Sequence, residues 1–142
     1  MDRLRVLVIS RDGPLVARLR MALGGEDGPE VKVISGGERA RAAATTPGFD
    51  AILIDPWAGL SLAELALLLA ENAGRLPVLA VSAEYPTAVA TVLFGLGVTD
   101  YLSLDHHADD FPAVLAALTR VPVAIAPHRA APRRARLRAP IA

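Results

Sequence analysis

Near-continuous apolar segments recur along this chain at a regular spacing. Four of them, at residues 4–9, 49–54, 77–81 and 101–104, are rich in branched side chains and show little alternation between apolar and polar positions. A weaker fifth segment, at residues 31–34, follows the turn-forming residues 26–29. Strands that are apolar on both faces are typical of a parallel sheet covered by helices on both sides. The pattern therefore predicts a buried parallel β-sheet.

Helix-length segments separate these apolar runs. We expect helices over residues 15–23, 38–46, 61–73, 86–95 and 108–120. Ser61, with Glu64 three residues later, is typical of a capping box at a helix start, and Gly13-Pro14 also favours a helix start. A strand followed by a helix, repeated five times, predicts right-handed crossovers and a doubly wound α/β fold.

The charge distribution divides the chain into a folded part and a tail. Net charge is zero, but residues 1–119 carry nine basic and fifteen acidic side chains, a net charge of −6. From Arg120 onward there are six arginines and no acidic residue, and residues 121–142 are rich in proline, alanine and arginine. We therefore predict one domain over residues 1–120 and a basic tail or linker over residues 121–142.

The composition indicates in which cellular compartment the protein is expected. Hydrophobic residues make up 53% of the chain and mean hydropathy is +0.39, which indicates a folded core rather than disorder. The uncharged stretch 85–99 is shorter than the ~20 residues of a membrane span, and the N-terminus lacks the pattern of a signal peptide. The chain has no cysteine, so disulfides and thiolate sites are excluded. We expect a cytoplasmic protein.

Chemistry in an open parallel sheet gathers beyond the carboxyl ends of the strands. In this sequence those positions are Ser10-Arg11-Asp12, Asp55-Pro56-Trp57, Ser82-Ala83 and Leu104-Asp105. Together with residues 37–40, the run FDAILID at 49–55, VSA at 81–83 and DYL at 100–102, they closely resemble the receiver domain of two-component response regulators. The resemblance covers residues 4–118. It implies a (βα)5 sheet with strand order 2-1-3-4-5, protein partners in signalling and no enzyme activity.

The candidate site residues match the functional positions of the family only in part. Asp55 falls on the phosphoacceptor position, Ser82 on the hydroxyl position and Tyr101 on the aromatic position that often reports activation. The acidic pair that holds a divalent cation falls on Ser10 and Arg11.

The lysine that contacts the phosphoryl group falls on Leu104. No neighbouring lysine replaces it, because Lys32 is the only lysine in the chain. Phosphoryl transfer depends on positioning and charge neutralisation, so these departures remove most of the catalysis. We predict a phosphorylation-independent interaction module with no catalytic residues, no metal site and no cofactor.

The sequence is compatible with several alternatives. Arg11 either pairs with Asp55 in place of the cation or points to solvent. A one-residue shift in the first strand would bring Asp12 into the pair, giving a phosphoacceptor that binds Mg²⁺ through Asp12 and Asp55. A flavodoxin-like small-ligand domain is disfavoured, because no glycine-rich phosphate loop follows the first strand.

Interaction surfaces are predicted at three places. The segment 87–97 carries no charge, which indicates a homodimer interface formed with the fifth strand and fifth helix and contributed by Val89, Val92, Leu93 and Phe94. Trp57 could cover the pocket or anchor a partner.

The tail lacks aromatic residues, so nucleic-acid binding is not favoured. It could be a linker, a docking arm or a segment that folds back on the acidic body. His106, His107, Asp109 and Asp110 lack the spacing of a metal site.

Overall fold

The computed structural model describes residues 3–120, and the predicted tail lies outside this range. Five parallel strands form one sheet in the order β2-β1-β3-β4-β5. They are β1 (Arg5–Ile9), β2 (Glu30–Ile34), β3 (Ala51–Ile54), β4 (Val78–Ser82) and β5 (Asp100–Ser103). The predicted doubly wound α/β fold and its strand order are confirmed.

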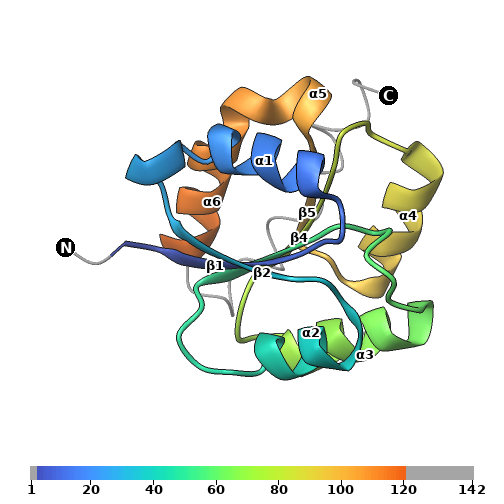
Figure 1. Cartoon of the computed structure of the whole chain (residues 1–142). Coiled ribbons are helices and arrows are strands. Elements are labelled where there is room, and N and C mark those ends of the chain that lie inside the picture. Colours follow the sequence, from blue (N-terminus) through green and yellow to red (C-terminus); the bar gives the residue numbers. More distant parts are fainter. Residues whose placement is uncertain (1–2, 121–142) are drawn as a thin grey trace.

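Helices cover both faces of the sheet (Figure 1). They are α1 (Gly13–Ala22), α2 (Gly37–Ala44), α3 (Leu62–Asn72), α4 (Thr87–Leu96), the short α5 (Leu104–His107) and α6 (Phe111–Arg120). Two 3-10 turns, η1 (Gly25–Asp27) and η2 (Ala108–Asp110), complete the order. The helix predicted over residues 108–120 is thus a 3-10 turn followed by α6.

Alternate residues of the strands serve two separate cores. Leu7, Ile9, Ile52 and Ile54 pack with α2, α3 and α4 on one face. On the other face, residues such as Val8, Leu53 and Leu79 pack with α1 and α6. This two-sided burial explains why the strands are apolar at almost every position.

Helix caps follow the sequence signals closely. The Ser61 hydroxyl accepts from the backbone N–H of Glu64 at 3.0 Å, and the Ser61 N–H donates to the Glu64 carboxylate at 2.8 Å. This capping box, as predicted, fixes the first turn of α3. At the start of α1, the Asp12 carboxylate accepts from the backbone N–H of Leu15 at 3.0 Å.

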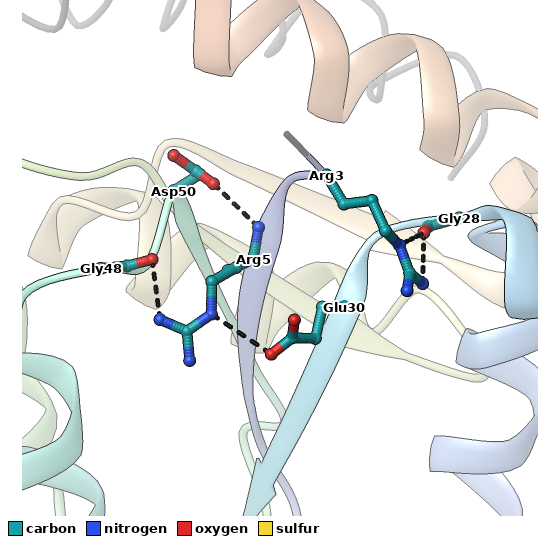
Figure 2. Close-up of polar contacts among 6 residues, drawn as sticks. All are labelled: Arg3, Arg5, Gly28, Glu30, Gly48 and Asp50. Carbon is teal, nitrogen blue, oxygen red and sulfur yellow. Dashed lines mark hydrogen bonds and ion pairs between the residues drawn. The ribbon is translucent and has the colours of Figure 1, made fainter. Parts of the chain in front are cut away.

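Two arginines tie the loops at the edge where the strands begin (Figure 2). Arg5 donates to the carboxylate of Glu30 and to the carbonyl of Gly48, both at 3.3 Å, and its backbone N–H donates to Asp50 at 2.8 Å. Arg3 donates to the carbonyl of Gly28 at 2.8 and 3.0 Å. These hydrogen bonds stabilise the amino edge of the sheet. The candidate site lies at the opposite, carboxyl edge.

None of the helices within residues 3–120 combines the length and the apolar character that a membrane span requires.

Candidate functional site

Asp55 lies directly after β3, and its carboxylate is hydrogen-bonded through both oxygens. The Ser10 hydroxyl donates to Oδ2 at 2.8 Å, and the backbone N–H of Trp57 donates to Oδ1 at 2.9 Å. The backbone N–H of Asp55 in turn donates to the carbonyl of Ile9 at 2.9 Å. With only 6% of its surface exposed, Asp55 is held by two uncharged donors, one from the residue that follows β1 and one from its own loop.

The strand register decides which residue of the first loop faces Asp55. Ile9 pairs with Ile54 across β1 and β3, so the next residues, Ser10 and Asp55, are neighbours. The shifted register that would bring Asp12 into the pair is therefore not the one found. Asp12 instead caps α1 with its carboxylate, and its backbone N–H donates to the Ser10 hydroxyl at 3.1 Å.

Arg11 is exposed, and its guanidinium lies against the loop that follows β3. A Cβ atom added at Gly59 would come within 2.8 Å of Arg11 Cζ. Gly59 also has a φ of +90°, a backbone conformation that favours glycine. In the part of the chain that the structure describes, the ion pairs do not include one between Arg11 and Asp55. Of the two alternatives for Arg11, pairing with Asp55 is not the arrangement found.

Ser82 and Tyr101 form a buried hydrogen-bonded pair beneath the site. The two hydroxyl oxygens are 2.7 Å apart, and the Ser82 hydroxyl also lies 2.5 Å from the carbonyl of Glu84. The Tyr101 ring is buried and makes an edge contact with Tyr85 at 5.3 Å between centroids. Burial raises the pKa of Tyr101 to about 12, so this phenol stays neutral and can donate to Ser82.

The side chain of Leu104 lies in the protein core. The residue begins α5, after β5 has ended at Ser103, rather than ending the strand as the sequence predicts. Only 4% of its surface is exposed, and it belongs to the same core cluster as Phe111 and Leu115. Lys32 is exposed on the edge strand β2. Neither residue brings a cation to Asp55.

A cleft of about 860 Å³ opens above Asp55 at the carboxyl edge of the sheet. We call it the carboxyl-edge cleft; its walls include Arg11, Asp12, Arg18, Asp55, Trp57, Ser82 and Glu84. Trp57 is 58% exposed. The structure thus brings most of the predicted site residues to one cleft.

Sequence reasoning missed one pair near this cleft. Arg18 of α1 donates to the carboxylate of Asp105 at 2.9 Å. The two residues are 87 positions apart, and nothing local in the sequence signals the contact. The pair joins α1 to α5 and neutralises one of the two arginines in the cleft wall.

The two histidines of α5 make local contacts at the end of β5. The buried His107 accepts from the backbone N–H of Ser103 through Nδ1 at 2.9 Å, and its ring contacts those of Tyr85 and His106. Within residues 3–120 no group of three histidine or acidic side chains is arranged to hold a metal ion.

The predicted interface on α4 needs a correction. Leu93 is 2% exposed and belongs to the core beneath the helix, so it cannot contact a partner. Val89 and Phe94 are half-buried and pack against the same core, whereas Val92 is 49% exposed. In a helix without charged residues, the sequence does not distinguish the buried face from the exposed face. For this reason the prediction placed all four apolar residues on one surface.

The strand order and the two helical layers define a flavodoxin-like doubly wound protein, and comparison with solved structures narrows this to one fold. The receiver domain of a Pseudomonas aeruginosa sensor histidine kinase is 18% identical, with a TM-score of 0.63 over 84% of this chain and 100% of that one. A Francisella response regulator receiver domain is 24% identical, with a TM-score of 0.66 over 83% of this chain and 98% of that one.

The Vibrio cholerae chemotaxis protein CheY4 is 17% identical, with a TM-score of 0.64 over 82% of this chain and 99% of that one. No protein-family model and no curated protein sequence matches the chain. The chain therefore has the fold of response regulator receiver domains, as its sequence resemblance predicted.

Proposed function

We propose that this chain is an atypical receiver domain of two-component-type signalling. It acts as a protein-interaction module that does not depend on phosphorylation. The observation that carries the proposal is the environment of Asp55. Its two carboxylate oxygens accept from a serine hydroxyl and a backbone N–H, while the lysine position is occupied by the core residue Leu104.

The donor set around Asp55 is a poor match for Mg²⁺. This ion prefers an octahedron of oxygen ligands that includes one or two carboxylates. Here Ser10 stands beside Asp55 where a carboxylate would be needed, and Asp12 is engaged as the cap of α1. No step through a metal ion is therefore part of the proposal, and the module needs neither catalytic residues nor a cofactor.

A single fixed state is consistent with the contacts of Tyr101. Its hydroxyl is held at 2.7 Å from Ser82, and its ring lies inside the protein against Tyr85. In the family that this chain resembles, the aromatic residue at this position often reports activation. A ring held inside by a hydrogen bond within the protein supports a module that presents one surface to its partners at all times.

The proposed partners are proteins of a signalling pathway, including a second copy of the chain. For the homodimer, the surface that remains after the correction to α4 is centred on Val92, with Val89 and Phe94 partly exposed beside it. α4 carries no charge along its length, so a second copy of this face meets no charge repulsion.

The decisive experiment treats the full chain with acetyl phosphate and Mg²⁺, and separately with beryllofluoride. Intact mass and ¹H–¹⁵N chemical shifts are then measured, with Asp55→Asn as the control. The proposal expects an unchanged mass and unchanged shifts. A stoichiometric phosphoryl adduct that is lost in Asp55→Asn would show instead a working phosphoacceptor.

A further inference from the structure

Asp55 carries a buried charge without a cation in the described part of the chain. A carboxylate offers about four acceptor positions. Among residues 3–120, only Ser10 and the backbone of Trp57 donate to the carboxylate of Asp55. Within residues 3–120, no ion pair includes Asp55. Buried charges in proteins are normally paired. Asp55 lines the carboxyl-edge cleft, so a cation that enters this cleft can reach it.

The cleft as a whole is net acidic. Asp12, Asp55 and Glu84 contribute three carboxylates to its wall, against the guanidinium groups of Arg11 and Arg18. Arg18 is already neutralised by Asp105, which lies outside the lining. Counting the described residues alone, one free positive charge thus faces three negative ones. The cleft therefore attracts cationic groups over a distance of about 8 Å at physiological salt.

The chain itself supplies a matching segment. Residues 129–138 contain five arginines and no acidic residue, while residues 1–119 carry a net charge of −6. A guanidinium forms bidentate hydrogen bonds with a carboxylate, and its planar face stacks on aromatic rings. The carboxylate of Asp55 and the indole of Trp57 line the same cleft, so one arginine side chain can contact both.

The length of chain after α6 is sufficient for this contact. α6 has 10 residues and ends at Arg120, and it runs back along the sheet towards the edge where the strands begin (Figure 1). Its length of about 15 Å and two strand spacings of about 5 Å give a return path of roughly 25 Å. The nine residues 121–129 span roughly 28 Å when extended. Every arginine from Arg129 onward is within reach.

We propose that the arginine-rich segment 129–138 docks into the carboxyl-edge cleft of the same molecule. One guanidinium pairs with Asp55, and its side chain covers Trp57. This inference rests on the proposed function, since it requires Asp55 to remain an unmodified carboxylate. The segment then supplies a positive charge beside Asp55, and a partner that binds the cleft has to displace it.

Trp57 provides the measurement, because it is the only tryptophan in the chain and lines the cleft. Acrylamide quenching of its fluorescence is compared between the full chain and a full-length variant with the five arginines of residues 129–138 replaced by glutamine. The variant should be quenched roughly twice as efficiently, since the ring loses a stacked side chain. Equal quenching in the two proteins overturns the proposal.

Two aspartates give a matched pair of charge changes. Asp55→Asn removes the proposed partner of the arginine but keeps a similar shape, and Asp27→Asn removes a charge from the exposed turn η1. Quenching should rise in Asp55→Asn and stay unchanged in Asp27→Asn. If both variants behave alike, the contact is not with Asp55 and the proposal fails.

Salt gives a further test of the same contact. Raising the salt to 1 M, where screening acts within about 3 Å, should expose Trp57 to acrylamide in the unmodified protein.

Protein concentration separates a contact within one molecule from a contact between two. The quenching constant should be the same across a hundredfold dilution, and a constant that rises on dilution overturns docking within the same molecule. The result is independent of the acetyl phosphate experiment. A phosphoryl adduct on Asp55 overturns the proposed function, whereas failure of the quenching test leaves that function standing and removes only the docked segment.

Discussion

The Ser10 hydroxyl donates a hydrogen bond of 2.8 Å to Oδ2 of Asp55. Ser10 also accepts from the backbone N–H of Asp12 at 3.1 Å, so one hydroxyl links the acidic residue after β3 to the start of α1. A neutral donor at this place stabilises a carboxylate without bringing in a second charge. The resemblance to receiver domains implies an acidic residue at the position of Ser10. The effect of restoring that acidic residue can be measured.

Ser10→Asp should destabilise the protein at neutral pH. The substitution places a second carboxylate beside the buried Asp55, and we expect a loss of about 1–3 kcal/mol in the free energy of unfolding. The measurement is urea unfolding at pH 7, with and without 10 mM MgCl₂. Mg²⁺ should recover part of the loss in Ser10→Asp but leave the unmodified protein unaffected. A Mg²⁺-dependent gain in the unmodified protein would contradict the proposed absence of a metal site.

Leu104 tests whether the lysine position has become part of the core. Leu104→Ala should cost about 2–5 kcal/mol, as expected for a leucine removed from a packed interior. Leu62→Ala is the matched control, because Leu62 is exposed on α3; it should change stability by less than about 0.5 kcal/mol. Equal effects in urea unfolding would mean that Leu104 does not pack as described.

The fold was predictable because its signals are local and repeated. Apolar strands, helix-length spacers and caps such as Ser61 with Glu64 each act within a few residues, and they agree with one topology. The boundaries were less predictable. Leu104 is as apolar as Leu102 of the strand before it, so only the structure shows that the chain turns into α5 at this residue.

The site was predictable at the level of which residues gather, but not of how they pair. Parallel strands bring Ser10, Asp55 and Ser82 to one edge, and the sequence contains that information. The position of Arg11 against Gly59 depends on the shape of a loop. The contact of Arg18 with Asp105 depends on the packing of α1 beside α5, and neither contact has a short-range signal.

Tyr101 should make stability depend on pH in the alkaline range. Its pKa of about 12 in the folded protein exceeds the value of about 10 for an unfolded tyrosine. The neutral phenol therefore favours folding fully below pH 10, and this contribution is lost as the pH rises from 10 towards 12. Urea unfolding at pH 8, 10 and 11 should show a decline that is smaller in Tyr101→Phe. An identical decline in both proteins would exclude Tyr101 as its source.

The exposed part of α4 provides the test of the homodimer. Val92→Asp places a charge on the 49% exposed face and should convert a dimer into a folded monomer, because an unpaired charge at a buried interface costs about 2–5 kcal/mol. Sedimentation velocity gives the oligomeric state, and circular dichroism shows that the fold is retained. Leu67→Asp is the matched control, since Leu67 is comparably exposed on α3. Leu93→Asp should instead unfold the protein, because that side chain lies in the core. If Val92→Asp and Leu67→Asp sediment alike, α4 is not the interface.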